Sequence, residues 1–553
     1  MASGRLSGLD DLAIDHAAFG NFALPGVFLR ASSCAVARGV FSSAATTMSR
    51  AETFPKPSIL CHFLPTDAPL KATQPVDFGA ALKPAVREGR EGDVAELLAA
   101  LTQARQMVTW ALDKDRSMVG VDELASRVRD YASLLRGFRA PPGAAAAPPP
   151  PPADADAAAP ADAAAAPADA AAPPPAYDAA APAATLRHAV SYAWRDLLDT
   201  KGRDWAMADC DLEEASVLLA AAQALLSRAA RESINDANAV AVYASLRRAA
   251  GFLGACRARV EAFDAAPRPP APAPKQAEGS SWFSRKKQAP AAPEDAAAAP
   301  EADGGERASQ DLRLGLAEAW AALALAEAQH ATIRRAAAAP HIEWSLIAAL
   351  CADERRRYAG AIAGRVASLT ANAASAKSVK EWAGKRVCTA FLKSHVDYKG
   401  AYFEALARYC AGAAALEKAV ADTDETSCGV ACAELAEAAR AMAAAAASAK
   451  DYVANAKAVC YVDSPVVALG DAAATIRRAL DRANQLNNGI FHKPVPPPGP
   501  LPPAKSLVTA IPFDDPPPSP LWTDKAWAAF DAAELPAPTF GPASEGRDCC
   551  VIS

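Results

Sequence analysis

The sequence predicts a mainly α-helical protein built as an irregular helical solenoid. Apolar residues recur at intervals of three, four and seven along most of the chain after Gly92, which is the pattern of amphipathic helices. A proline-rich stretch, residues 55–78, precedes them and favours one or two strands packed on helices. Because each helix has an apolar face that needs a partner, we expect a packed array.

The first 54 residues are compatible with two origins. They contain several arginines and serines and no acidic residue between Asp15 and Glu52, as transit peptides do. The aspartates at the start of the segment are untypical of such peptides. A disordered extension, or translation that begins at Met48, is the alternative.

Helical periodicity continues through the body of the chain and stops near Gly489, after which the sequence is proline-rich and extended. Near the end, one short helix is expected at Thr523–Asp531, with the Thr523 hydroxyl as its N-cap. The longer helices are expected at residues 94–108, 121–138, 186–198, 212–226, 240–263, 312–325, 346–370, 377–422, 428–460 and 465–487.

Two tracts of mostly Ala, Pro and Asp interrupt the helices, at about 140–184 and 265–308. They lack the apolar side chains that could offset the entropy lost on ordering, so we expect both to be disordered. Flexible linkers between separate domains are an alternative, but the flanking segments carry apolar faces that need one another. We therefore expect one domain at 55–535 and a tail at 536–553.

The composition argues against several classes of function. A formal net charge of -6 and 7% aromatic residues give no overall attraction to nucleic acid or to an anionic membrane. No apolar run approaches the ~20 residues that span a bilayer. Twelve cysteines occur without a repeated spacing, and the closest internal pair, Cys428 and Cys432, lacks the further ligands of a zinc site. Reduced thiols in a cytoplasmic protein, with no metal or cofactor, are expected.

Motifs of the common enzyme classes do not occur in this sequence. There is no phosphate loop of Walker type, no H-E-x-x-H and no G-x-S-x-G. His395, Asp397 and Tyr398 lie close together, but no nucleophile accompanies them, so solvated or capping roles are expected. The sequence predicts a protein that is not an enzyme.

The last four residues, Cys550-Val551-Ile552-Ser553, form a C-a-a-X box. Its terminal serine favours a farnesyl group on Cys550. One prenyl chain gives only marginal, reversible membrane binding, and the preceding residues offer no polybasic second signal. Palmitoylation of Cys549, or simultaneous binding to a membrane-bound protein, could supply a second attachment to the membrane.

Several passages, in order over about residues 65–535, resemble the Bro domain family, and most of all its members that end in a CaaX box. The passages that carry the resemblance are Pro69–Phe78, Ala326–Gln329, Thr332-Ile333, Leu346–Leu350, Tyr402–Ala407, Asn488–Pro496, Ile511–Phe513, Leu521–Thr523 and Ala528–Asp531.

The resemblance implies a boomerang-shaped helical solenoid, similar to tetratricopeptide repeats, with a small N-terminal β-sheet. It also implies an adaptor that holds the C-terminal helix of an ESCRT-III subunit, of the charged multivesicular body protein class, in an apolar groove. We would then expect it in the cytoplasm, held at the surface of endomembranes by its lipid. A helical-repeat scaffold for an unrelated protein is the alternative.

By the same resemblance, the groove residues fall on Thr332 or Ile333 and on Leu346 and Leu350. The two leucines are one helical turn apart and would present one apolar ridge, although such pairs are more often buried core. The loop before Leu346 is one residue longer than the family pattern, which makes Ser345 a competing alignment. Proline runs at 148–152 and 494–503 could bind SH3-like domains or act as spacers.

Overall fold

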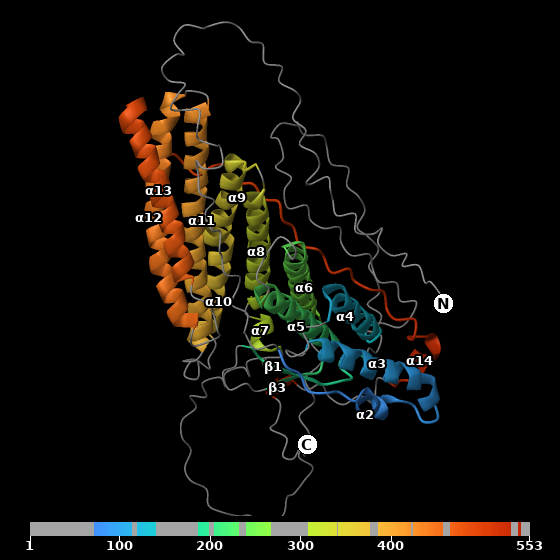
Figure 1. Cartoon of the computed structure of the whole chain (residues 1–553). Helices are drawn as coiled ribbons and strands as arrows, with labels where there is room; N and C mark the ends of the chain where they lie inside the picture. The colour runs from blue at the N-terminus through green and yellow to red at the C-terminus, as the bar shows by residue number, and fades with distance from the viewer. Residues whose placement is uncertain are drawn as a thin grey trace, which may run out of the picture. The chain divides into compact units, whose positions relative to one another are not determined.

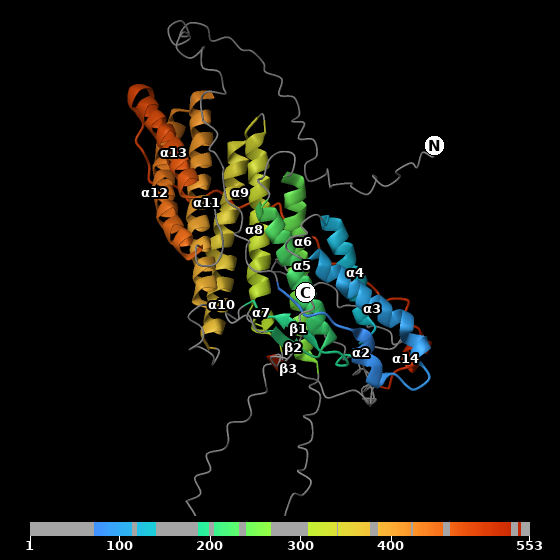
Figure 2. The same ribbon diagram turned by 60° about the horizontal axis from the view of Figure 1, so that its bottom comes forward.

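The computed structural model of the protein is a series of helices in which each packs against the next along the chain (Figures 1 and 2). It describes residues 71–112, 119–139, 186–197, 204–231, 239–266, 308–313, 315–339, 341–375, 385–421, 424–456, 465–531 and 540–542. The principal helices, in packing order, are α3 (Glu91–Ala111), α4 (Val121–Arg136), α5 (Cys210–Arg231), α6 (Ala239–Ala265), α8 (Leu316–Ala338), α9 (Trp344–Arg357), α11 (Lys385–Ala421), α12 (Glu425–Ala456) and α13 (Val466–Leu486).

The predicted fold class, mainly α with a small sheet, is confirmed. The helix expected at 346–370 is α9 continued by a π-helical turn, Tyr358–Ile362, and by α10 (Ala363–Ser375). The short helices are α2 (Phe78–Leu82), the 3-10 helix η1 (Lys83–Ala85), α7 (Gln310–Arg313) and α14 (Asp524–Ala528). None of the helices in the described ranges is long and apolar enough to cross a membrane.

The helices on either side of each Ala/Pro-rich tract pack against one another. Helix α4 contacts α5 across the first tract, and α6 contacts α8 across the second. Almost all of both tracts, and all of residues 1–70 and 543–553, lie outside the described residues.

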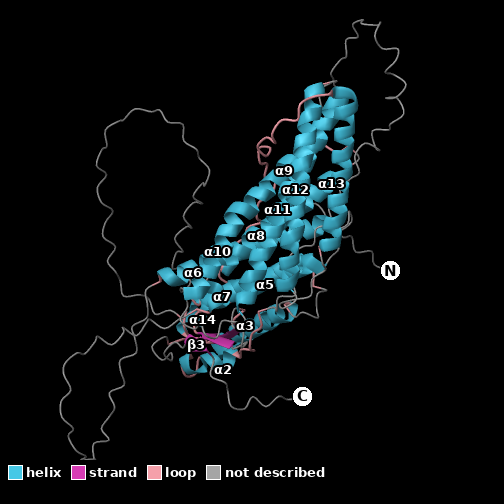
Figure 3. Ribbon diagram, turned by 90° about the vertical axis from the view of Figure 1, so that its left-hand side faces the viewer, coloured by secondary structure: helices cyan, strands magenta, loops and turns pink. Residues whose placement is uncertain are grey.

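The small sheet corrects two expectations from the sequence. Its antiparallel strands are β1 (Tyr192–Arg195), β2 (Asp204–Met207) and β3 (Phe540–Pro542), so they come from the middle and the end of the chain (Figure 3). Of the N-terminal stretch, the described part contributes an isolated bridge from Thr73 to Trp194. Strand β3 also extends the folded region beyond the expected end at residue 535.

The helix predicted at 186–198 is wrong, because this segment forms a turn and strand β1. Its buried residues, Val190, Tyr192 and Trp194, alternate with more exposed ones. That is the two-residue period of a strand, which a short apolar segment does not distinguish clearly from a helical period.

The C-terminal region expected to be extended is a single strap, residues 492–523, that crosses the helices from the end of α13 to α14 (Figure 1). Thr523 ends it as the N-cap of α14, where its hydroxyl accepts a hydrogen bond from the Ala526 amide, as predicted. Hydrogen bonds anchor the backbone of the strap to successive helices. Lys493 is bonded to η5 (Asn487–Phe491), Gly499 to α11 and α12, and Lys505 to α8 and α9. Ile511 is bonded to α6 and Pro517 to α4.

Further backbone hydrogen bonds lie between and beyond these anchors, at Leu507, Thr509, Pro516 and Ser519, so the strap is held at closely spaced points after Lys505. Between the anchored residues, Pro502 is half-buried, and Val508 and Pro516 are buried. From Gly499 onward the partners of the strap pass in turn from α11 and α12 to α8 and α9, then to α6 and to α4.

Close contacts fix the strap against the helices. A Cβ atom added at Gly251 of α6 would lie 1.7 Å from the Ile511 carbonyl oxygen, and one at Gly137 would lie 2.1 Å from the Trp522 ring. The Trp522 Nε1 donates a hydrogen bond of 2.8 Å to the Leu134 carbonyl. No side chain larger than hydrogen fits at either glycine while the strap is in place.

Replacing Gly251 with alanine should destabilise the fold, because the added Cβ would overlap the Ile511 carbonyl of the strap. Gly254→Ala on the same helix is the matched control, because nothing lies within 4 Å of a Cβ atom at that position. We expect the larger fall in melting temperature, followed by circular dichroism, for Gly251→Ala; an equal fall would show that the close contact with the strap has no role.

Candidate protein-binding site

The residues expected to form a groove lie on the antiparallel hairpin of α8 and α9. Trp344 opens α9 and packs edge-on against Tyr409 of α11, with ring centroids 5.9 Å apart. The apolar residues that follow at helical spacing, Ile347, Leu350 and Cys351, turn toward the core. Helix α8 of the hairpin packs against α6, and helix α9 packs against α11.

The four expected groove residues differ in how much surface they offer. Ile333 and Leu350 have no exposed surface, and Thr332 is buried with its hydroxyl donating to the Ala328 carbonyl of its own helix. Leu346 is half-buried, and its neighbour Ser345 is exposed. The expected ridge of two leucines is therefore not exposed in this structure: Leu346 reaches the surface, and Leu350 lies in the core beneath it.

The strap passes along the same hairpin. The Gln329 side chain behaves like a backbone peptide unit, because its Nε2 donates to the Lys505 carbonyl at 3.0 Å and its Oε1 accepts from the Leu507 amide at 3.2 Å. The Lys505 amide donates to the Ala349 carbonyl of α9 at 3.1 Å. This recognition of an extended segment could not be found from the sequence, because the partners are more than 150 residues apart.

A closed cluster of charged groups lies under this hairpin. The Glu327 carboxylate of α8 pairs with the Lys399 ammonium of α11 at 3.0 Å, and both side chains have zero exposure. The Tyr358 hydroxyl donates to the same carboxylate at 2.9 Å. His330 and His395 approach it at 3.4 and 3.6 Å. One carboxylate therefore joins α8, the π-helical turn and α11.

The electrostatics of the cluster follow from burial and pairing. Burial raises the pKa of Glu327, but the Lys399 charge and the histidine contacts outweigh it and hold the pKa well below its usual range. Burial and the Lys399 charge lower the pKa of His330 to about 4. The Glu354 carboxylate oxygens have no hydrogen-bond partner, and burial raises the pKa of Glu354, which favours the protonated form.

The solvated or capping role expected for His395 and Tyr398 is wrong. Both side chains are buried, and the Tyr452 ring packs against both of them from α12. Asp397 is exposed and pairs with Lys393 one turn away at 2.6 Å. Since 395 and 398 lie on one face of α11 and 397 on another, the helix separates the three residues that sequence proximity had grouped.

Replacing His330 with glutamine should reduce the loss of stability in mild acid. The unfolded imidazole takes up a proton near pH 6.5, whereas the folded one does so only near pH 4, so stability falls as the pH drops between these values. The difference in the His330 pKa between the folded and unfolded states lowers the free energy of unfolding by at most about 3 kcal/mol over this range. Urea unfolding from pH 7.5 to 4.5 measures it, with His341→Gln, at an exposed position, as the control. Identical pH profiles for wild type and His330→Gln would contradict this role.

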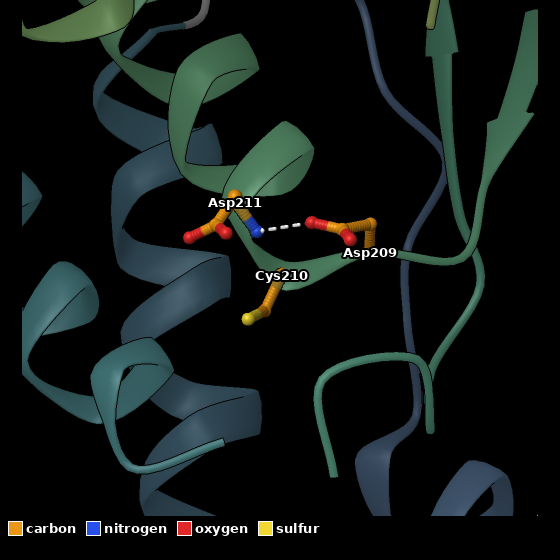
Figure 4. A group of neighbouring side chains, drawn as sticks. All are labelled: Asp209, Cys210 and Asp211. Carbon is orange, nitrogen blue, oxygen red and sulfur yellow. Dashed lines mark hydrogen bonds between the residues drawn. The ribbon is translucent and has the colours of Figure 1, made fainter. Parts of the chain in front are cut away.

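Among the described residues, Asp209, Cys210 and Asp211 form a group whose side chains lie close enough to hold a metal ion (Figure 4). Asp209 caps α5 by accepting the Asp211 amide at 2.8 Å. Arg187 pairs with both carboxylates, at 2.7 and 2.8 Å, and Arg139 pairs with Asp211 at 2.5 Å. Burial raises the pKa of the Cys210 thiol well above its usual range, so it stays protonated. Two guanidinium groups already balance the charge that a cation would neutralise.

The remaining predicted site residues, Cys549 and Cys550, lie outside the described residues.

Comparisons with known proteins address the family. The chain matches the BRO1-like domain over residues 181–528, which is more than half of its length. No curated protein sequence matches it. A crystal structure of ALIX in complex with the SIVmac239 PYKEVTEDL late domain aligns with a TM-score of 0.51 and 14% identity, covering 83% of this chain and 50% of that chain. An ALIX BRO1 CHMP4C complex aligns with a TM-score of 0.48 and 15% identity, covering 82% and 96%.

The chain thus spans about half the length of the first ALIX chain, and the likeness to it is one of fold. Together, the successive helices, the small sheet and the family match over residues 181–528 show that this protein belongs to the BRO1-like domain family.

Proposed function

We propose that this protein is a non-enzymatic adaptor that binds the C-terminal helix of an ESCRT-III subunit of the charged multivesicular body protein class. Membership of the BRO1-like family and the sequence resemblance around the α8–α9 hairpin support this proposal. The observation that carries it is Leu346, a large apolar side chain left half-buried on that hairpin. It offers an amphipathic helix an apolar contact.

The geometry implies a weak interaction. Leu346 is flanked by exposed polar residues, Glu343 and Ser345, so the apolar contact is small and has a polar rim. Burying one leucine contributes ~1.5–3 kcal/mol before the entropy of association is subtracted. Ile333 and Leu350 are buried and offer a partner no surface. Micromolar affinity is expected, with a function in membrane remodelling or endosomal sorting that depends on a second attachment.

Replacing Leu346 with aspartate should weaken binding of ESCRT-III C-terminal peptides by at least about tenfold, because a carboxylate replaces the apolar contact. Fluorescence anisotropy with labelled peptides measures this, and circular dichroism checks the fold. Val467→Asp is the control, because Val467 is 74% exposed on α13. Leu350→Asp is unsuitable, since a buried charge at that position would unfold the domain.

A helical-repeat scaffold for an unrelated protein is the alternative function. Failure of every ESCRT-III peptide to bind the wild-type chain would favour it. Binding that Leu346→Asp does not change would instead place the ESCRT-III site elsewhere on the domain.

We further propose that Cys550 is farnesylated, with Cys549 as a possible second lipid site, and that the protein resides at the cytoplasmic face of endomembranes. The C-a-a-X sequence supports this proposal. The lipid and the weak contact with the ESCRT-III helix would reinforce each other, because membrane attachment raises the effective concentration of one partner for the other.

Cys550→Ser should move the protein from the membrane fraction to the soluble fraction of cells, since serine cannot form the thioether. Mass spectrometry of the wild-type C-terminus should show a prenylated cysteine without residues 551–553. A free thiol at Cys550 followed by an intact Val551-Ile552-Ser553 would overturn the lipid assignment. Cys549→Ser separates the two cysteines, because it removes only a second lipid.

SH3-like domains are proposed as a second kind of partner, for the proline runs. The run at 494–503 belongs to the strap, and its prolines at 494, 496, 497, 498, 500 and 503 are exposed. The run at 148–152 lies outside the described residues.

A further inference from the structure

Ser506 of the strap lies at the surface with an arginine side chain against its hydroxyl. The Arg357 Nη2 of α9 donates a hydrogen bond of 2.5 Å to the Ser506 Oγ, although the two residues are 149 positions apart in the sequence. Ser506 is exposed, and so are Lys505 before it and Leu507 after it. The hydroxyl is therefore accessible to an enzyme and already has a guanidinium group beside it.

The backbone on both sides of Ser506 is held in place. Gln329 accepts the Leu507 amide and donates to the Lys505 carbonyl, and the Lys505 amide donates to the Ala349 carbonyl of α9. Because these bonds flank Ser506 directly, its side chain has a defined position over α9. A group attached to the hydroxyl would stay beside Arg357.

Arg357 is itself held in place by a buried carboxylate. Its Nε lies 2.7 Å from Asp353 Oδ2, and Arg356 Nη2 lies 2.6 Å from Asp353 Oδ1. The Asp353 side chain has no exposed surface. Two guanidinium groups thus share one carboxylate, which leaves a positive charge without a counterpart in this group.

The charges around Ser506 add to this excess. The Lys505 side chain is exposed and forms no ion pair with any residue that the structure describes. The Glu354 carboxyl lies 3.9 Å from Arg357 Nε, but burial raises the pKa of Glu354 and favours its neutral form. Three cations, Lys505, Arg356 and Arg357, therefore accompany one ionised carboxylate. The surplus of two positive charges matches the charge of a phosphoserine side chain.

A second hydroxyl of the strap is less well placed. The Arg247 Nη2 of α6 lies 3.4 Å from the Thr509 Oγ1, at the limit of a hydrogen bond. The Arg247 Nε is already used by the Thr509 carbonyl at 2.7 Å. Ser506 has the shorter contact and the greater surplus of positive charge.

We propose that Ser506 is a phosphorylation site and that Arg357 binds the phosphate, which strengthens the attachment of the strap to α9. A serine/threonine kinase would transfer the γ-phosphoryl group of ATP: the bond from Ser506 Oγ to phosphorus forms, the bond from that phosphorus to the β–γ bridging oxygen breaks, ADP leaves, and the hydroxyl proton passes to solvent. Hydrogen bonds from a guanidinium to a phosphate are about twice as strong as those between neutral groups. The site does not depend on the proposed ESCRT-III contact or on the lipid.

The first test uses the full chain with phosphoserine placed at position 506 during translation, by suppression of a stop codon. In a phosphopeptide of residues 501–511 the second pKa of the phosphate should be about 6. In the folded chain the cations should lower that pKa to about 5, measured by ³¹P NMR across a pH titration. The phosphorylated chain should also melt at a higher temperature than the unmodified chain at neutral pH.

Two arginine variants of the phosphorylated chain separate the contact from the general charge. Arg357→Gln should return the phosphate pKa toward the value in the peptide. Arg356→Gln is the matched control, because it removes the same charge from the same carboxylate but not the contact with Ser506, and it should keep most of the fall. Melting temperatures check that both variants are folded, and the comparison with the peptide needs neither variant.

The second test asks whether the modification occurs. Mass spectrometry of the protein from cells treated with a phosphatase inhibitor should place a phosphate on Ser506, and Ser506→Ala should remove it. No phosphate at Ser506 in fragments that cover the residue would overturn the modification. A phosphate that titrates as it does in the peptide, or equal effects of the two arginine variants, would overturn Arg357 as its binding group.

Discussion

The positions of the helical hairpins depend on a segment that has no regular secondary structure of its own. The strap contacts η5 at Lys493, the α11–α12 pair at Gly499, the α8–α9 pair at Lys505, α6 at Ile511 and α4 at Pro517. Proline makes this possible, because it stiffens the chain and needs no hydrogen-bonded ladder. A flexible segment of equal length would connect the same helices without setting their spacing.

The same constraint shapes the candidate binding site. Gln329 of the α8–α9 hairpin is hydrogen-bonded to the strap, and Glu327 of the same hairpin forms a buried ion pair with Lys399 of α11. A buried ion pair contributes little net stability, but loss of one partner leaves an unpaired buried charge. The hairpin therefore has few alternative positions, and Leu346 stays where a partner helix could contact it.

Each proposed function depends on a weak attachment. One prenyl group, one small apolar contact and one proline run would each give reversible binding. Joined in one chain, they would act together, because each attachment raises the local concentration for the others. Such a protein would dwell only where a membrane and its protein partners coincide.

The sequence by itself determined most of the helices, the extended strap and the Thr523 cap, because these follow from local periodicity, proline content and the hydroxyl before a helix. It also pointed to the family through passages such as Ala326–Gln329. Only the tertiary structure decided that Leu350 is core while Leu346 is accessible, that 186–198 contains a strand, and that His395 is buried. Periodicity identifies the apolar face of a helix, but whether another part of the same chain covers that face depends on residues far away in the sequence.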